Sequence, residues 1–322
     1  MQRLRLALLG FALGLACCGG IPPESVPSDP IAFVRQEPAK GLLNLEAFRK
    51  GLQIKAFDEA DEEHTPRLHT TLTLMTVPTG EVRAVPDIGE GALPLDWSAD
   101  GERLLIGRPD LAGGPIQLLT WDRLNGLYAR MSSKRSLGSA ALGEGPIQIA
   151  GVGRMRSPEG VSFRGVIVRT YEGGPELLTP GRGCIDPDVA PDGKTVIFVR
   201  PPRGQTSREP QILMARLGEE EAQPLGRGSH PRYSRDGQWI VFTRQRAGNS
   251  DVWLMRGDGS HRRSIVTTNY DEENPAISVH GNYVVYASAR GLKEESQLYL
   301  TRVEDGVEIQ LTRNGQNGRP IW

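Results

Sequence analysis

The stretch that decides the fold is HPRYSRDGQWIVFTR, residues 230–244. The same phrase recurs as DPDVAPDGKTVIFVR at 186–200 and as NPAISVHGNYVVYASAR at 274–290, and RPIW at 319–322 repeats its opening. The prolines of these four copies are spaced by 44, 44 and 45 residues, and in each complete copy a glycine lies six residues after the proline. A fixed period of this length is typical of a repeat architecture in which each repeat is one supersecondary unit.

Each repeat contains the signals for four short strands. An Asp-Gly or His-Gly pair marks a tight turn, because glycine supplies the positive φ that hairpin turns require. The run after this turn, such as VIFVR or WIVFTR, is apolar at consecutive positions, which favours a strand covered on both faces. Two further runs follow, as in DVWLMRGDG and GSHRRSIVT. Four strands with a period in the low forties predict the blade of a β-propeller.

The rest of the chain supplies three more blades. LPLDWSADGERLLIG, at 93–107, begins a further copy, and 145–180 holds a degenerate one. PIAFVRQ, from Pro30, and the run at 72–86 match strands two to four of a blade whose first strand is missing, and RPIW can provide that strand. We therefore predict an all-β, six-bladed β-propeller over 30–322, closed by pairing of the N- and C-terminal segments, with an insertion in blade one at 38–68. Such closure removes exposed sheet edges.

The repeat resembles that of TolB-type propellers, whose usual form is P-x-W-S-P-D-G, an apolar strand and then I-Y-x-M-x-x-D-G. PRYSRDGQWIVF and DVWLMRGDGS carry this resemblance, which covers most of the chain after residue 86. Blade three has lost the motif, and we expect no counterpart of the N-terminal α/β domain of TolB, for which there is no room. The resemblance implies the fold, and by analogy a partner from a peptidoglycan-associated or trans-envelope complex.

Residues 1–18, MQRLRLALLGFALGLACC, predict a signal peptide, since two arginines precede an apolar stretch too short for a stable membrane span. Leu15-Ala16-Cys17-Cys18 resembles the lipobox of bacterial lipoproteins, in which a small residue precedes the acylated cysteine. Cys18 has the usual leucine three residues earlier but a cysteine directly before it, whereas Cys17 follows an alanine but lacks that leucine. We predict lipidation at Cys18, and the alternative is a plain secretory signal cut nearby.

These features predict a protein of the bacterial envelope. With Cys18 as the mature N-terminus, the next residue is Gly19 rather than aspartate, which favours an outer-membrane lipoprotein facing the periplasm under enterobacterial sorting rules; without the lipid, we expect secretion to the periplasm. Residues 19–29 are rich in proline, glycine and serine and predict a flexible tether, so the membrane is contacted through the lipid anchor only. Cys184 then remains as the one thiol, and packing rather than disulfides must stabilise the fold.

Composition argues against several functions. The chain has 322 residues, a formal net charge of −1 and a pI near 6.6, so it has no general attraction to phosphates and we expect no nucleic-acid partner. We find no phosphate loop, nucleophile elbow or paired-cysteine zinc site, and we expect no cofactor. The acidic stretch at 58–69 holds His64 and His69, but their spacing matches no ligand signature, so we predict a solvated loop and no metal.

Most of the repeated polar and aromatic residues are predicted to be structural. Aspartate before a turn glycine serves the turn rather than acid–base chemistry, and the repeated tryptophans suit packing between blades. These residues are Asp100, Asp192 and Asp236, and Trp97, Trp239 and Trp253. We therefore predict no catalytic residue.

The candidate binding surface is one mouth of the propeller channel. The segments that join the outer strand of one blade to the inner strand of the next, such as TTNYDEEN at 267–274, are predicted to lie there. Loops on a rigid scaffold concentrate binding residues, and mixed charges with a tyrosine suit protein or peptide recognition. The candidate partner-binding residues are Arg182, Arg227, His230, Tyr270, Asp271, Glu272 and Asn317.

We predict a monomeric, non-catalytic propeller that acts as a tethered adaptor and binds an envelope protein or peptide through this mouth. GLLNLEAFRKGLQIKAF, at 41–57, has the spacing of a short amphipathic helix that covers either the propeller itself or a partner. The alternative function is a periplasmic hydrolase or lyase with its site at the channel, which a pocket with convergent titratable groups would favour. Propeller peptidases carry an additional hydrolase domain, which we do not expect in this protein.

Overall fold

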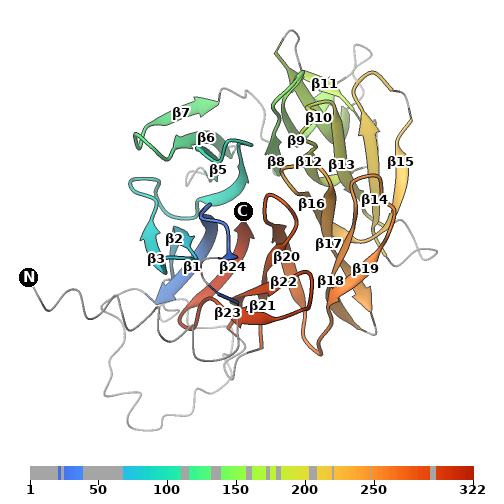
Figure 1. Ribbon diagram of the computed structural model, residues 1–322. Coiled ribbons are helices and arrows are strands. Elements are labelled where there is room, and N and C mark those ends of the chain that lie inside the picture. The colour runs from blue at the N-terminus through green and yellow to red at the C-terminus, as the bar shows by residue number, and fades with distance from the viewer. Residues whose placement is uncertain are drawn as a thin grey trace, which may run out of the picture.

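The computed structural model describes residues 21–22, 25–38, 68–109, 116–131, 139–156, 162–171, 175–178, 183–202, 209–219, 221–246, 248–290 and 295–322. Within these ranges, 24 strands form six four-stranded sheets with antiparallel pairing. The sheets stand in a ring, and the C-terminus lies near its centre (Figure 1). The first strands of successive sheets contact one another around a closed cycle. The predicted six-bladed β-propeller is therefore confirmed.

The blades follow one another in sequence, apart from the blade that the chain ends share. Blade one contains β24 (Gln316–Ile321), β1 (Ile31–Pro38), β2 (Leu68–Thr76) and β3 (Glu81–Ala84), and blade two β4 (Leu93–Trp97), β5 (Arg103–Arg108), β6 (Gln117–Asp122) and β7 (Tyr128–Met131). Blade three contains β8 (Ala140–Leu142), β9 (Ile147–Arg156), β10 (Ser162–Thr170) and β11 (Pro175–Leu177), and blade four β12 (Ile185–Val189), β13 (Thr195–Arg200), β14 (Gln211–Arg216) and β15 (Gln223–Arg227). Blade five contains β16 (Ser229–Tyr233), β17 (Trp239–Arg246), β18 (Asn249–Arg256) and β19 (Arg263–Val266), and blade six β20 (Glu272–Ile277), β21 (Tyr283–Ser288), β22 (Gln297–Arg302) and β23 (Glu308–Gln310).

The ring is closed by pairing of the two chain ends in blade one. β24 runs antiparallel to β1, with Ile321 opposite Ala32 and Gln316 opposite Gln36. This confirms that the RPIW segment supplies the missing first strand. Pro38 pairs with Leu68 at the far end of the β1–β2 hairpin, so the predicted insertion leaves and re-enters the sheet there.

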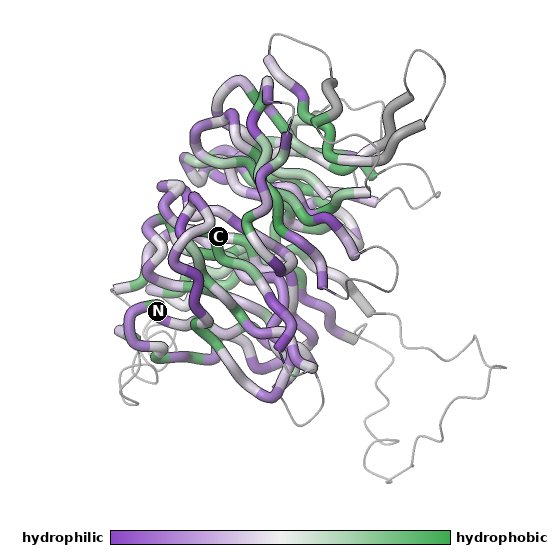
Figure 2. The backbone as a smooth tube through the Cα atoms, turned by 90° about the vertical axis from the view of Figure 1, so that its right-hand side faces the viewer, coloured by the Kyte–Doolittle hydropathy of each residue, from purple (hydrophilic) through white to green (hydrophobic). Residues whose placement is uncertain are grey.

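The apolar core is divided into six clusters, one at each junction between neighbouring blades. The second strand of a blade contributes to both junctions because successive side chains point to opposite faces. In β13, Val196 and Phe198 pack towards blade three, whereas Ile197 and Val199 pack towards blade five. The hydrophobic segments accordingly run through the interior of the blades, with hydrophilic ones at their ends (Figure 2). This arrangement explains why the run VIFVR has no polar face.

The repeated Asp-Gly pairs form the predicted tight turns. The side chain of Asp192 accepts hydrogen bonds from the backbone N–H groups of Lys194 and Thr195, each at 2.8 Å, so this carboxylate holds its own turn. Gly193 has a φ of 61°, and a Cβ there would overlap the backbone of Gly145 in blade three. Gly145, in the degenerate blade three, thus lies where the turn of blade four contacts it. The equivalent glycines, with φ between 68° and 75°, are Gly101, Gly237 and Gly281.

The segment predicted as a flexible tether packs on the propeller from Ile21 onward. Ile21 and Val26 are 1% and 4% exposed and belong to the core between blades one and six. The hydroxyl groups of Tyr283 and Ser25 lie 2.8 Å apart. A free tether would leave these apolar side chains in water, at a cost that burial avoids. Residues 21–22 and 25–29 therefore pack with the propeller.

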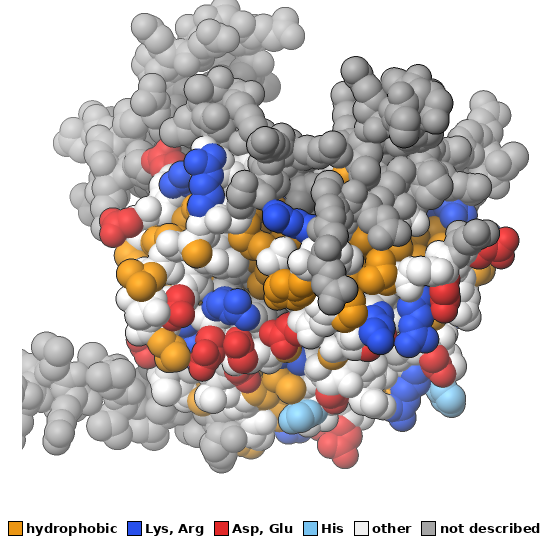
Figure 3. All heavy atoms as spheres, turned by 90° about the horizontal axis from the view of Figure 1, so that it is seen from above, with side chains coloured by type: hydrophobic (Ala, Val, Ile, Leu, Met, Phe, Trp, Pro, Cys, Tyr) orange, Lys and Arg blue, Asp and Glu red, His pale blue; other side chains and the backbone are white. Residues whose placement is uncertain are grey.

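Several predictions concern residues outside the described ranges: the signal peptide at 1–18, Cys18, the insertion residues 39–67 and Arg182. Among the described residues, no helix has the length and apolar character needed to cross a bilayer. On the face seen in Figure 3, basic and acidic side chains are interspersed with apolar ones, in keeping with the net charge of −1.

Candidate functional site

The channel has two ends, which we name from the connections that surround them. The loop end is surrounded by the segments that join one blade to the next, and the turn end by the tight turns that contain Gly101, Gly193, Gly237 and Gly281. The insertion of blade one leaves its hairpin at the loop end, because Gln36 lies opposite Gln316, where β24 begins.

A backbone irregularity recurs at the loop end in four blades. The residue before the repeat proline has a φ of 49° or 50°, in the left-handed region that residues other than glycine rarely adopt. The pairing of the first strand shifts register at this point in each case. Such a bulge redirects the side chain of the extra residue. The four residues are Arg319 in blade one, Asp186 in blade four, His230 in blade five and Asn274 in blade six; we call them the mouth residues.

The mouth residues line one cavity of about 200 Å³. Blades one and four are opposite in a six-membered ring, so Arg319 and Asp186 stand across the opening from each other. His230 lies beside Asp186, with Nε2 3.8 Å from the Asp186 carboxylate. Burial lowers the pKa of His230 below its usual value, although Asp186 acts in the opposite direction. The neutral imidazole therefore dominates at pH 7, and the cavity wall is polar with opposite charges on opposite sides.

Arg232 forms the floor of this cavity and is held by Asp188. The guanidinium donates to the Asp188 carboxylate at 3.1 Å, and Asp188 also accepts the backbone N–H of Tyr233 in the next blade at 2.7 Å. Arg232 lines a second, smaller cavity of about 70 Å³ on the turn side as well. It therefore separates the two parts of the channel.

Asp96 lies in the smaller cavity and joins blade two to blade three. Its carboxylate accepts the backbone N–H groups of Trp97 and Leu142, both at 2.8 Å. Burial raises the pKa of Asp96 to about 7, and the nearby Asp188 adds to the effect while Arg232 opposes it. Sequence reasoning missed both channel carboxylates, although they occupy the same position of the repeat, four residues before the turn aspartate.

Asp29, from the segment before β1, and Trp322, the last residue, lie together at the turn end of the channel. The backbone oxygen of Asp29 accepts a hydrogen bond from the indole of Trp322 at 3.1 Å, and its carboxylate accepts one from Arg235 at 3.4 Å. A Cβ on Gly101 would lie 3.2 Å from the Asp29 carboxylate and 2.9 Å from the Arg235 guanidinium. Because Gly101 and Arg235 belong to opposite blades, two and five, Asp29 lies between turns from across the channel.

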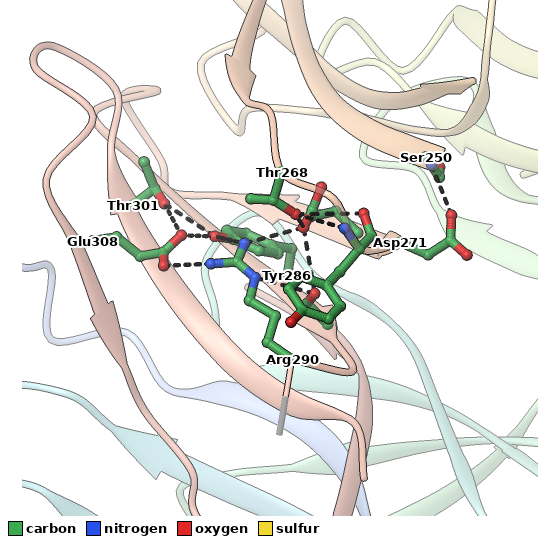
Figure 4. Close-up of polar contacts among 10 residues, drawn as sticks. Ser250, Thr268, Asp271, Tyr286, Arg290, Thr301 and Glu308 are labelled. Atoms are coloured by element: carbon green, nitrogen blue, oxygen red, sulfur yellow. Dashed lines mark hydrogen bonds and ion pairs between the residues drawn. The ribbon is translucent and has the colours of Figure 1, made fainter. Parts of the chain in front are cut away.

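Two of the predicted rim residues are buried. Glu272 is fully buried and accepts hydrogen bonds from the hydroxyl of Thr268 at 2.6 Å and from Arg290 at 3.1 Å (Figure 4). Asn317 is also fully buried; it accepts from Arg35 at 3.1 Å and donates to the Gln297 side chain at 3.1 Å. Their side chains therefore hold the loop end together and do not face a partner.

The Glu272 site belongs to a larger polar cluster in blade six. Arg290 bridges Glu272 and Glu308, with a 2.6 Å contact to the latter (Figure 4). Its guanidinium also lies over the ring of Tyr299. The Tyr286 hydroxyl donates to Glu308 as well. Burial raises the pKa of Glu272 above its usual value, while the hydrogen bonds from Thr268 and Arg290 act against this. The cluster fixes the segment that carries Tyr270 and Asp271.

The other described rim residues are accessible to a partner. Tyr270 is 48% exposed, and Asp271 is exposed while its carboxylate accepts the backbone N–H of Ser250 in blade five at 2.7 Å. Arg227 is exposed at the end of β15, 3.7 Å from Glu209. His230 is a mouth residue. These residues lie at the loop end as predicted, whereas Arg182 lies outside the described residues.

Sequence reasoning missed three of the four mouth residues, Asp186, Asn274 and Arg319. A signal was present, because Asp, His and Asn precede the repeat proline in three successive copies. These three residue types are the ones that adopt left-handed conformations most readily after glycine. Arg319 also precedes a repeat proline, but arginine has no preference for the left-handed conformation that it adopts there.

The comparisons with known proteins agree with the fold. No family model matches the chain. It is similar to an uncharacterized protein of Agrobacterium fabrum, Atu1656, with 40% identity over 63 residues that cover 20% of this chain and 22% of that protein. It is also similar to the Tol-Pal system protein TolB of Anaeromyxobacter dehalogenans, with 28% identity over 119 residues, 35% of this chain and 25% of the relative. The matched part thus spans about a quarter or less of these curated relatives.

Among solved structures, TolB from Acinetobacter baumannii superposes with a TM-score of 0.67 at 17% identity, covering 100% of this chain and 73% of the other. At this identity the likeness concerns the fold and carries no function with it. Together, the repeat, the closed ring of six blades and these similarities define a TolB-like β-propeller.

Proposed function

We propose that this protein is a non-catalytic binding module of the bacterial cell envelope, and that the loop-end cavity receives a segment of a partner protein or peptide. The observation that carries the proposal is the recurrent bulge: four blades use the same irregular backbone position to direct a polar side chain into one cavity. Rigid strands hold these side chains before any ligand arrives, which lowers the cost of ordering them on binding.

The setting comes from the sequence and from the relatives. The relative in Anaeromyxobacter dehalogenans is named as part of the Tol-Pal system, which supports a periplasmic location and an envelope protein as partner. We propose that residues 1–18 are a signal peptide and that Cys18 is lipidated, so that a monomeric propeller faces the periplasm from the outer membrane. Ile21, three residues after Cys18, packs between blades one and six, which would keep the propeller close to its anchor.

A hydrolase or lyase acting in the channel is the second candidate, and the convergence of Asp96, Asp188 and Arg232 is the observation that favours it. A carboxyl group with a pKa of about 7 is suited to proton transfer at neutral pH. Binding is favoured over catalysis because the carboxylates of Asp96 and Asp188 already accept backbone N–H groups that join neighbouring blades. Their positions are explained by the assembly of the ring.

Site-specific photo-cross-linking in living cells tests the binding proposal. A benzoylphenylalanine at position 270 would replace Tyr270 at the loop end, and the same residue at position 124 would replace Leu124, which is 71% exposed on a turn of blade two, as the matched control. We expect a discrete protein adduct from position 270 and none of the same mass from position 124. No adduct at 270, or identical adducts from both positions, would overturn the proposal. Glu272 is left intact, because it is buried.

A further inference from the structure

Two of the mouth residues have polar groups that no described residue engages. His230 lies 3.3 Å from the Thr243 hydroxyl and beside Asp186, and Arg232 on the cavity floor is paired with Asp188. By contrast, the guanidinium of Arg319 and the side-chain amide of Asn274 make no hydrogen bond or ion pair with any residue that the structure describes, and both line the cavity. They belong to neighbouring blades, one and six.

The backbone at Arg319 makes this arrangement costly. Its φ is 50°, a conformation in which arginine is not favoured, and it precedes a proline, which normally keeps the residue before it extended. Strained backbone that persists at an accessible site is a reason to look for a function there. The strain at Arg319 directs a cationic side chain at a polar cavity where, among the described residues, it has no counter-ion.

From this geometry we propose that the loop-end cavity binds a carboxylate group of the partner segment, with Arg319 and Asn274 as its hydrogen-bond donors. The inference rests on the proposed function and specifies its chemistry. A guanidinium matches a carboxylate with two parallel N–H donors, and an amide NH₂ adds a third. The cavity of about 200 Å³ admits one side chain or a chain end. Asp186, on the opposite wall, disfavours a second carboxylate and so fixes the direction in which the segment enters.

The carboxylate can come from an acidic side chain or from a C-terminus, and three short peptides separate these sources. Acetyl-Gly-Glu-Gly-amide carries a side-chain carboxylate, acetyl-Gly-Gly-Gly with a free C-terminus carries a terminal one, and acetyl-Gly-Gln-Gly-amide carries neither. Titration of ¹⁵N-labelled full-length protein, followed through the arginine Nε–Hε signals, would report binding directly. We expect a saturable shift of the Arg319 signal with one or both carboxylate peptides and none with the neutral peptide.

Two variants with opposite expected effects test the role of the residues. Arg319→Gln should weaken binding of the carboxylate peptide about tenfold or more, as the loss of a charged hydrogen-bond partner implies. Arg83→Gln removes the same charge from an exposed position on the outermost strand of the same blade and should change nothing. Asp186→Asn removes the repelling carboxylate and should tighten binding several-fold.

Equal binding of the neutral peptide, or full affinity in Arg319→Gln, would overturn the inference. If Arg319→Gln fails to fold, Asp186→Asn decides, because unchanged or weaker carboxylate binding in that variant is incompatible with the proposed geometry. A cross-linked adduct at position 270 together with no carboxylate preference would leave the proposed function standing and remove only this inference.

Discussion

The two ends of the channel are made from the same repeats but differ in how their polar groups are used. At the turn end, Asp29 bonds with both Arg235 and Trp322, so the polar groups there hold the structure together. At the loop end, Arg319 and Asn274 face a cavity and have no partner among the described residues. The turn end thus contributes to stability, whereas the loop end, which the buried Glu272 and Asn317 hold together, also keeps hydrogen-bonding capacity for a ligand.

The residue types support the same distinction. The turn position keeps glycine in all of the recognisable repeats, because a Cβ is disfavoured at a φ of 61° to 75° and would also meet neighbouring atoms there. The mouth position keeps its backbone conformation but changes its side chain from blade to blade: Asp186, His230, Asn274 and Arg319. A constant backbone with variable side chains is the arrangement expected of a binding surface on a rigid scaffold.

The largest effect is expected at the turn end, from Trp322→Ala. The indole is 7% exposed, packs in the core between blades one and six and bonds with Asp29, so its removal leaves a cavity at the point of ring closure. We expect a loss of about 4 kcal/mol in the free energy of unfolding, measured by urea denaturation. Leu124→Ala, at an exposed position of a turn, should change the free energy by less than about 0.5 kcal/mol. A loss below about 1 kcal/mol for Trp322→Ala would show that the closure does not depend on this contact.

A matched pair of substitutions in the 267–274 segment tests whether different residues of the loop end stabilise the fold and bind the partner. Glu272→Ala leaves Arg290 without the buried one of its two carboxylate partners, and we expect a loss of about 3 kcal/mol in unfolding free energy. Tyr270→Ala, two residues away, removes an exposed ring and should cost less than about 0.5 kcal/mol while weakening partner capture. Equal stability losses in the two variants would mean that the exposed tyrosine is also structural.

The sequence predicts the fold because most of the blades repeat the same sequence signals. The proline spacing, the turn glycines and the doubly apolar strands identify the blades, and RPIW shows which strand the C-terminus supplies. The burial of Glu272 and Asn317 is not predictable in the same way. It depends on Arg290, which follows β21 in the same blade as Glu272, and on Gln297, which reaches Asn317 from β22 of the neighbouring blade six.

Two further features of the structure run against local sequence rules. A residue before proline is expected to be extended, so the left-handed conformation at Arg319 is set by the bulge in β24 and not by its own preference. The proline- and serine-rich composition of residues 19–29 indicates a tether, yet Ile21 and Val26 pack into the core. These two apolar side chains were the signal that composition alone obscured.

Asp96 lies between the two ends of the channel, and its ionisation should make stability depend on pH. Its pKa is about 7 in the folded protein against 3.8 for an ordinary aspartate, so between these values the folded state holds a proton that the unfolded state has lost. Protonation of Asp96 therefore favours the folded state at low pH. The free energy of unfolding falls as pH rises from about 4 to about 7, by up to about 1.4 kcal/mol per pH unit. Urea midpoints between pH 5 and pH 8 should fall more steeply for the wild type than for Asp96→Asn. Parallel slopes would show that Asp96 keeps an ordinary pKa.

The smallest effect on stability is expected from Arg319→Gln, which at the same time is the sharpest test of the contrast between the two ends. The Arg319 side chain makes no hydrogen bond or ion pair with the described residues, so the change should alter the urea unfolding free energy by no more than about 0.5 kcal/mol. Glutamine keeps a polar side chain and must adopt the same left-handed backbone, so the change removes the guanidinium with its charge and reach and leaves the backbone conformation as it was. A loss above about 2 kcal/mol would show that Arg319 supports the ring as Trp322 does, and the loop end would then be structural like the turn end. A stable variant that no longer binds a carboxylate peptide would assign the strained backbone at this position to recognition.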